Sequence, residues 1–301
     1  MNKIITATQF MARKVVGMIL RIYCPSEKQI PDQVELLKRA IRRGRKSTVA
    51  GKKLIRRFDI LIWSDERYKE SDCGKTASVL RGIFANDKDV FIHEIKHGDI
   101  YCGILNYGIA HQLRYGHVDY SIIASSEAYS YMTEETFESI TEAACNGARI
   151  IGVATNELAQ SVLEGRVANT FAMWHNESLM TVGGFNFRVA KPIDGVPAIE
   201  VEAWHENLNR FVKFKLVGEE ELITSFEMVK LLNEPCIAPV IASCMEGAEY
   251  IVPDKKSNYD KWIHHESKMC TKEIRATGIL GMVNCDKSFL KGGVMPKYRT
   301  F

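Results

Sequence analysis

The sequence predicts an α/β fold in which a mostly parallel sheet is flanked by helices and followed by a mixed α+β half. Short β-branched apolar runs alternate with segments of helical spacing between Val15 and Ala154. Such alternation indicates parallel crossover units and a sheet covered on both faces. After Gly165 the alternation weakens, and segments rich in aromatic, glycine and acidic residues follow. With 301 residues, 46% of them hydrophobic, the chain can bury a sizeable core.

Each expected element follows from its own pattern of apolar residues. Short apolar runs predict five strands, at Val15–Tyr23, Phe58–Trp63, Val90–His93, Tyr120–Ala124 and Ile150–Ala154. Apolar residues at helical spacing predict helices at Asp32–Arg43, Thr76–Phe84 and Ile104–Tyr115, and a fourth after Thr133. Asp32 is the expected N-cap of the first helix. Thr133 is the expected N-cap of the last, whose apolar face is Phe137, Ile140 and Ala144.

Polar residues follow three of these strands. In open α/β sheets, ligands bind beyond the carboxyl ends of the strands. The ends expected here are Cys24-Pro25, Ser64-Asp65 and Ser125–Glu127. These three segments are therefore the first candidates for a binding site.

Composition excludes several classes of protein. The net charge of +3 does not indicate a nucleic-acid partner. None of the eight cysteines forms a Cys-x-x-Cys pair, so we expect free buried thiols and no structural zinc. No secretory signal and no apolar stretch of about 20 residues is evident, so we expect a cytoplasmic protein with at most peripheral contact at the inner membrane face.

The run from Lys38 to Arg57 is rich in lysine and arginine. It could attract anionic lipid or a phosphorylated acceptor. The simpler interpretation is a solvated helix face followed by a loop.

Four sequence features follow one another along the chain. The first strand ends at Pro25, before Ser26 and Glu27, and the second ends in Ser64-Asp65-Glu66. Asn106-Tyr107-Gly108 then precedes the strand that ends in Ser125-Ser126-Glu127. Asn169–Trp174 leads to Val182-Gly183-Gly184-Phe185, and Glu200-Val201-Glu202 follows. This order resembles the family 2 glycosyltransferases, which have a GT-A, Rossmann-like fold, and the resemblance covers Val15 to Pro239.

The resemblance implies a role for each matching residue. Pro25, Glu27, Asp65, Asn106, Gly108, Ser125 and Glu127 would bind the nucleotide, with Asp65 against the base. Trp174, Gly183, Gly184 and Phe185 would line the acceptor side. Glu202 or Glu200 would act as the catalytic base.

The sequence departs from this family at the metal-binding strand end. The family usually has Asp-x-Asp there, whereas this chain has Ser125-Ser126-Glu127, and only Glu127 keeps a carboxylate. A divalent ion, Mn²⁺ or Mg²⁺, would therefore bind weakly or be dispensable. Glu127 is the main candidate ligand and His205 a second candidate.

Each candidate also has a purely structural interpretation. Asp65 fits a solvated turn, and Gly183-Gly184 fits a tight turn that needs positive φ. Glu200 and Glu202 alternate as on a strand, so they share one face, which could simply be solvated. A lone histidine such as His205 is more often structural than metal-ligating.

The resemblance therefore implies an enzyme that transfers a sugar from a nucleotide-diphosphate sugar to an acceptor hydroxyl with inversion. The acceptor, a glycan, lipid or protein, is left open. The alternative is a non-catalytic relative that binds a nucleotide or sugar, or acts as a scaffold. We expect a leader at residues 1–14, a GT-A-like domain at 15–240 and a C-terminal extension at 241–301.

Overall fold

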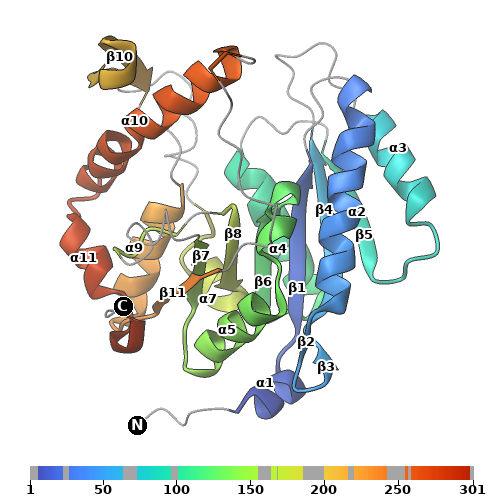
Figure 1. The fold of residues 1–301 in the computed structure, drawn as a ribbon. Helices are drawn as coiled ribbons and strands as arrows, with labels where there is room; N and C mark the ends of the chain where they lie inside the picture. The colour runs from blue at the N-terminus through green and yellow to red at the C-terminus, as the bar shows by residue number, and fades with distance from the viewer. Residues whose placement is uncertain are drawn as a thin grey trace.

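The computed structural model describes residues 6–22, 27–63, 73–95, 101–154, 164–167, 169–185, 200–215, 220–242, 255–256 and 259–298. Their centre is a seven-stranded sheet in the order β11-β7-β8-β6-β1-β4-β5 (Figure 1). The strands are β1 (Val16–Ile22), β4 (Ile55–Trp63), β5 (Val90–Ile95), β6 (Tyr120–Ser125), β7 (Ile150–Ala154), β8 (Phe171–His175) and β11 (Ile237–Ile241). Only β8 runs antiparallel to its neighbours, β6 and β7. The predicted fold class, a mostly parallel sheet with flanking helices, is confirmed.

Helices cover both faces of this sheet. One face carries α1 (Ala7–Arg13), α2 (Ile30–Lys46), α3 (Cys73–Ile83), the 3₁₀ helix η2 (Ser126–Tyr131) and α5 (Glu134–Cys145). The other carries α4 (Tyr101–Gly116), α7 (Asn176–Thr181), α9 (Glu220–Leu232), α10 (Tyr259–Gly281) and α11 (Lys287–Gly292). Because side chains alternate along a strand, Met18 and Leu20 of β1 enter the first core and Ile19 enters the second.

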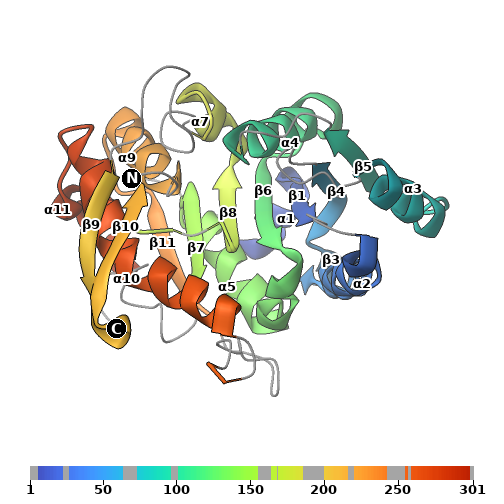
Figure 2. The same cartoon turned by 90° about the horizontal axis from the view of Figure 1, so that it is seen from above.

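Two short antiparallel ribbons and three further 3₁₀ turns complete the described elements. The ribbons are β2 (Thr48–Val49) with β3 (Lys52–Lys53), and β9 (Glu200–His205) with β10 (Arg210–Lys215). The turns are η1 (Glu27–Gln29), η4 (Glu206–Leu208) and η5 (Pro296–Tyr298). Figure 2 shows the β9–β10 ribbon beside α10, beyond the β11 end of the sheet.

All five predicted strands and all four predicted helices are present, with ends shifted by a few residues. Thr133 caps α5 as predicted, and its side chain accepts a hydrogen bond from the Thr136 backbone N–H at 3.1 Å. The prediction that Asp32 caps α2 is wrong, because α2 already begins at Ile30 and Asp32 lies in its first turn. The cause is Pro31, whose fixed φ favours the first helical positions and starts the helix earlier.

Both terminal segments pack onto the sheet. Phe10 and Met11 of α1 are buried in the first core. Leu290 and Val294 are buried in the second, and the Cys236 backbone N–H donates to the carbonyl of Gly293 at 3.0 Å. The leader and the C-terminal extension expected from the sequence thus contribute side chains to the same two cores as the central region.

Four cysteines of the described residues are free and buried: Cys102, Cys145, Cys236 and Cys285. Burial raises the pKa of Cys236 to about 12 and that of Cys145 to about 11. These thiols act as small apolar side chains, as the sequence predicted for them.

Within the described residues, no helix combines the length and the apolar character that a bilayer crossing requires.

Candidate functional site

The order in which the chain adds strands to the sheet reverses at β1. From β1 the chain moves to β4 and β5 on one side, then crosses through α4 to β6 on the other side of β1. The carboxyl ends of β1 and β6 therefore lie side by side at a topological switch point (Figure 1). In open α/β sheets, ligands bind in the crevice outside such a point.

Arg21 and Ser125 lie at this switch point. They are direct partners in the β1–β6 register, so their side chains leave the sheet on the same face. An Nη2–H of Arg21 donates to the carbonyl of Asn169 at 2.8 Å, and the Ser125 backbone N–H donates to the carbonyl of Thr170 at 2.9 Å. Both bonds hold the segment before β8 against the strand ends.

Asn169 connects this edge to two further elements. Its side-chain oxygen accepts from the Trp174 indole N–H at 3.0 Å, and its backbone N–H donates to the Glu221 carboxylate of α9 at 2.8 Å. A basic group, a hydroxyl, backbone carbonyls and a carboxylate are thus brought to this edge from β1, β6, the segment before β8, and α9. Such a set suits a polar, charged ligand.

Sequence reasoning missed Arg21 and Glu221. Arg21 belongs to an otherwise apolar strand, which its sequence predicts to be buried as a whole. The available signal was a single basic residue just before the carboxyl end of a buried strand, where ligand sites concentrate. Glu221 gave no such signal, because it joins the edge through a tertiary contact with Asn169, which is far away in the sequence.

The other residues predicted at the strand ends are only partly described. Pro25 and Asp65 lie outside the described residues, as does the side chain of Glu127, whose backbone belongs to η2. Glu27 is exposed, and its carboxylate forms an ion pair with Lys75 of α3. The roles of these four residues in nucleotide binding remain predictions.

Asn106 clamps the Val182–Phe185 segment to α4. Its side-chain amide donates to the carbonyl of Phe185 at 3.0 Å, and its side-chain oxygen accepts from the Phe185 backbone N–H at 2.7 Å. Gly184 has a φ of +80°, and a Cβ there would lie 2.7 Å from the Asn106 Cγ. Two segments singled out separately in the sequence therefore contact each other directly.

The neighbouring candidates pack in the core. Phe185 and Trp174 are both fully buried, and their rings meet edge to face with centroids 5.1 Å apart. Gly108 lets α4 approach the sheet, because a Cβ there would lie 3.0 Å from the Leu61 Cδ1. Gly183 is exposed, with a φ of +89°. The structure gives Trp174, Gly108 and Phe185 a packing role, and their contact with a ligand remains a prediction.

Glu200, Glu202 and His205 lie on the β9–β10 ribbon. Glu200 and Glu202 are exposed on one face, as expected from their alternation, and Glu202 pairs with Lys213 across the ribbon at 3.2 Å. His205 is buried and belongs to the opposite face. Figure 2 places this ribbon beyond β11, which is three strands from β6. The structure therefore does not bring these three residues to the switch point, and their catalytic and metal-binding roles remain predictions.

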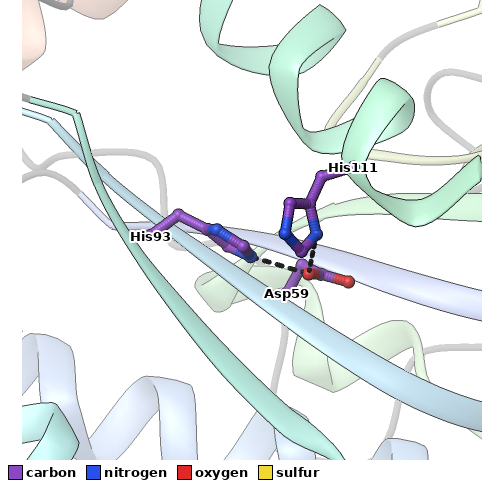
Figure 3. A group of neighbouring side chains, drawn as sticks. All are labelled: Asp59, His93 and His111. Atoms are coloured by element: carbon purple, nitrogen blue, oxygen red, sulfur yellow. Dashed lines mark hydrogen bonds and ion pairs between the residues drawn. The ribbon is translucent and has the colours of Figure 1, made fainter. Parts of the chain in front are cut away.

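A second polar cluster, not anticipated from the sequence, lies between the sheet and α4. Asp59 of β4 is fully buried, and its Oδ1 lies 2.7 Å from His93 Nε2 and 3.5 Å from His111 Nδ1 (Figure 3). The Arg57 guanidinium donates to both carboxylate oxygens, from Nε to Oδ2 at 2.7 Å and from Nη2 to Oδ1 at 2.9 Å. Gln112 donates to Oδ2 at 2.8 Å. Four polar side chains thus surround one buried carboxylate.

The electrostatics of this cluster favour a charged Asp59. Burial alone raises the pKa of this carboxyl, but hydrogen bonds from His93, Arg57 and Gln112 outweigh it and hold the pKa below its usual value. Burial lowers the pKa of His111, and neighbouring His93 lowers it further. Its neutral Nδ1 can then accept from the Arg57 guanidinium, 2.8 Å away.

Asp59, His93 and His111 could hold a divalent metal ion, because three ligand atoms of suitable type lie within 4.8 Å of one another. Arg57 competes with such an ion, since its guanidinium contacts both Asp59 Oδ1 and His111 Nδ1. An ion added beside Arg57 would leave a buried excess of positive charge. Asp59 also lies four residues before the end of β4, below the carboxyl edge. We therefore assign the cluster to stability rather than to ligand binding.

The protein-family models and the curated protein sequences give no match to this chain. Among solved structures, a mannosyltransferase, PcManGT from Pyrobaculum calidifontis, in complex with GDP-Man and Mn²⁺, is similar with a TM-score of 0.52 and 12% identity. The similarity covers 93% of this chain and 69% of that one. The chain therefore has a GT-A-like α/β fold.

A second solved structure shows a weaker similarity. It is 4-diphosphocytidyl-2C-methyl-D-erythritol synthase from Anaerococcus prevotii, with a TM-score of 0.35 and 8% identity over 87% of this chain and 99% of that one. This TM-score falls below the level at which two folds match.

Proposed function

We propose that this chain is a glycosyltransferase that transfers a sugar from a nucleotide-diphosphate sugar to an acceptor hydroxyl, with inversion. The observation that carries the proposal is the pairing of Arg21 with Ser125 at the switch point of a GT-A-like sheet. The solved structure of similar fold holds GDP-Man and Mn²⁺. The Val182–Phe185 segment supports a family 2 type of transferase.

The charges at the strand end set how the diphosphate would be held. The Ser125 hydroxyl is a neutral oxygen donor, and Arg21 beside it is a cation, so this edge repels a free metal ion more than an Asp-x-Asp edge would. Glu127, the Ser125 hydroxyl and the phosphates of the ligand would together hold Mn²⁺ or Mg²⁺ weakly. Such an ion would offset the charge of the diphosphate, and the Arg21 guanidinium would offset it in the same place.

The remaining roles follow from the sequence. Asp65 would contact the nucleotide base, and the acceptor would pass Val182–Phe185. Glu202 or Glu200 would remove the proton from the acceptor hydroxyl as that oxygen attacks the anomeric carbon. This role requires the β9–β10 ribbon to approach the switch point when ligands bind. General-base catalysis of this kind contributes about 10²–10⁴-fold.

The test is a thermal-shift screen with nucleoside diphosphates and their sugars, with Mn²⁺ and with a chelator. A ligand at 100 times its Kd stabilises the folded state by about 2.7 kcal/mol. We expect stabilisation by a nucleoside diphosphate and by the matching nucleotide-diphosphate sugar. We also expect slow hydrolysis of that nucleotide-diphosphate sugar, which releases the nucleoside diphosphate. Stabilisation without turnover, with any acceptor, would instead support a non-catalytic binding protein. No stabilisation by any nucleotide would refute both.

Within this screen, Asp65→Ala should weaken binding of the nucleotide, and Glu127→Gln should remove the part of the stabilisation that depends on Mn²⁺. Substitution of whichever of Glu202 and Glu200 is the base by glutamine should leave nucleotide binding intact and lower turnover about 10²–10⁴-fold. Unchanged turnover in Glu202→Gln and in Glu200→Gln would exclude both as the base.

A further inference from the structure

The run from Lys38 to Arg57 covers the solvated face of α2, the β2–β3 hairpin that follows it and the start of β4. It contains ten lysine and arginine residues and no acidic residue. Three of the ten are neutralised: Lys38 pairs with Glu35, Arg45 with Asp87 and Asp89, and Arg57 with Asp59. Among the described residues, the other seven form no ion pair. We call these seven the basic surface: Arg39, Arg42, Arg43, Lys46, Lys52, Lys53 and Arg56.

The fold brings six of these side chains onto α2 and the hairpin that follows it, and the seventh, Arg56, donates to the Met11 carbonyl of α1 at 2.9 Å. Arg39, Arg42, Arg43 and Lys46 occupy the face of α2 opposite its buried residues, at helical spacings of three and four. Lys52 and Lys53 are exposed on the β2–β3 hairpin that follows. Figure 1 shows this hairpin at the end of α2, next to α1. Six of the seven side chains are exposed and Arg43 is half-buried.

We propose that the basic surface docks the protein on an anionic lipid bilayer through the phosphates of its headgroups. Each lysine or arginine near an anionic bilayer adds to the attraction, so seven together make binding effective although the whole chain carries only +3. The proposal is independent of the transferase function, because none of the seven belongs to the switch point.

The composition of the surface favours a bilayer over a nucleic acid. Sites for single-stranded nucleic acid combine basic side chains with aromatic rings on which bases stack. None of the exposed aromatic side chains of the described residues lies on α1, α2 or the hairpin. The basic surface presents long, flexible cationic side chains beside the small Ala50-Gly51 turn. Such side chains can contact an array of phosphates, but they provide no ring on which a base could stack.

The experiment is sedimentation of the full chain with vesicles of phosphatidylcholine alone, or of phosphatidylcholine mixed with phosphatidylglycerol, at low and at physiological salt. The test variant removes four exposed charges of the basic surface: Arg42→Gln, Lys46→Gln, Lys52→Gln and Lys53→Gln. The matched control removes four exposed charges from α9, α11 and the turn before α10: Lys230→Gln, Lys255→Gln, Lys256→Gln and Lys291→Gln. Both variants change the net charge equally, and circular dichroism checks that both are folded.

We expect the chain to sediment with the phosphatidylglycerol vesicles only, and less at higher salt. The test variant should bind at least 100-fold more weakly, at about five-fold per charge removed, whereas the control should bind within a few-fold of the parent. Equal loss in the two variants, or equal binding to neutral vesicles, would overturn the proposal. Tighter binding of single-stranded RNA than of vesicles at the same salt, abolished in the test variant, would assign the surface to nucleic acid and also overturn it.

Discussion

Replacing Asp59 with asparagine should destabilise the fold more than almost any other single substitution that preserves side-chain shape. The Asp59 carboxylate accepts from Arg57, His93 and Gln112, and all of these groups are buried. In asparagine an NH₂ group replaces one of the two carboxylate oxygens, so a donor would face the donor groups of Arg57, His93 or Gln112. It also leaves the Arg57 guanidinium, 7% exposed, without its counter-ion.

The magnitude follows from the burial of this ion pair. Removing one partner of a buried ion pair costs about 3–5 kcal/mol, because the remaining charge is left uncompensated. We expect a loss of this size in the free energy of unfolding, measured by urea denaturation at pH 7. The exposed control Asp32→Asn should change it by no more than about 0.5 kcal/mol. The double variant Arg57→Met with Asp59→Leu should recover much of the loss, because both buried charges are then removed.

The pH dependence gives an independent check. Since the folded-state pKa of Asp59 is lowered, its stabilising contribution is present above its unfolded pKa of about 3.9 and is lost as pH falls through the folded pKa. Asp59→Asn should flatten the acid limb of the stability curve. A loss below about 1 kcal/mol at pH 7, or an unchanged acid limb, would show that Asp59 does not anchor this cluster.

Two further predictions concern a tight turn and a buried histidine. Gly184→Ala should lower the free energy of unfolding by at least about 2 kcal/mol, because its Cβ would meet the Asn106 amide at positive φ. Gly183→Ala should lower it by only about 1 kcal/mol of backbone strain, because no atom lies within 4 Å of the added Cβ. Equal losses of stability in thermal denaturation would contradict the contact between Asn106 and Gly184. Burial, assisted by Arg149, lowers the pKa of His175 to about 4. Stability should therefore fall as pH drops from about 6.5 towards 4, by about 2 kcal/mol at pH 5. His175→Asn, which keeps a side-chain cap for α7, should remove this fall, and an unchanged pH profile would assign it to another group.

The five strands and four helices predicted between Val15 and Ala154 are each marked by a local pattern of apolar residues, whereas α1 and the short β2–β3 hairpin are not. The buried face of α5 and its Thr133 cap are examples, since both depend only on residues close in sequence. The antiparallel insertion of β8 between β6 and β7 was not predictable in this way. Phe171–His175 is an apolar run like the others, and its partners and direction are set by contacts with residues far away in the sequence.

The candidate site was predictable only in its location. The rule that ligands bind at the carboxyl ends of parallel strands indicated the region of Ser125. Arg21 was hidden inside an apolar strand, and the Asp59 cluster combines residues from β4, β5 and α4 whose proximity depends on the sheet order. Gln112 in that cluster occupies space that only glycine leaves free at position 17, since a Cβ there would lie 2.6 Å from the Gln112 Oε1. The periodicity of the sequence does not indicate this contact, because Gly17 and Gln112 are far apart in the chain.

Binding of a nucleoside diphosphate at the β1–β6 switch point can be measured by calorimetric titration of the chain and of the variants Arg21→Gln and Arg21→Lys. The titrants are a nucleoside diphosphate and the matching monophosphate, with a chelator present. A hydrogen bond to a charged group is worth about 1.5–3 kcal/mol, so Arg21→Gln should weaken diphosphate binding about 10- to 100-fold. Monophosphate binding should change less, and Arg21→Lys should restore part of the diphosphate affinity. Unchanged diphosphate binding in a folded Arg21→Gln variant would show that the ligand lies elsewhere on the protein and not at the switch point.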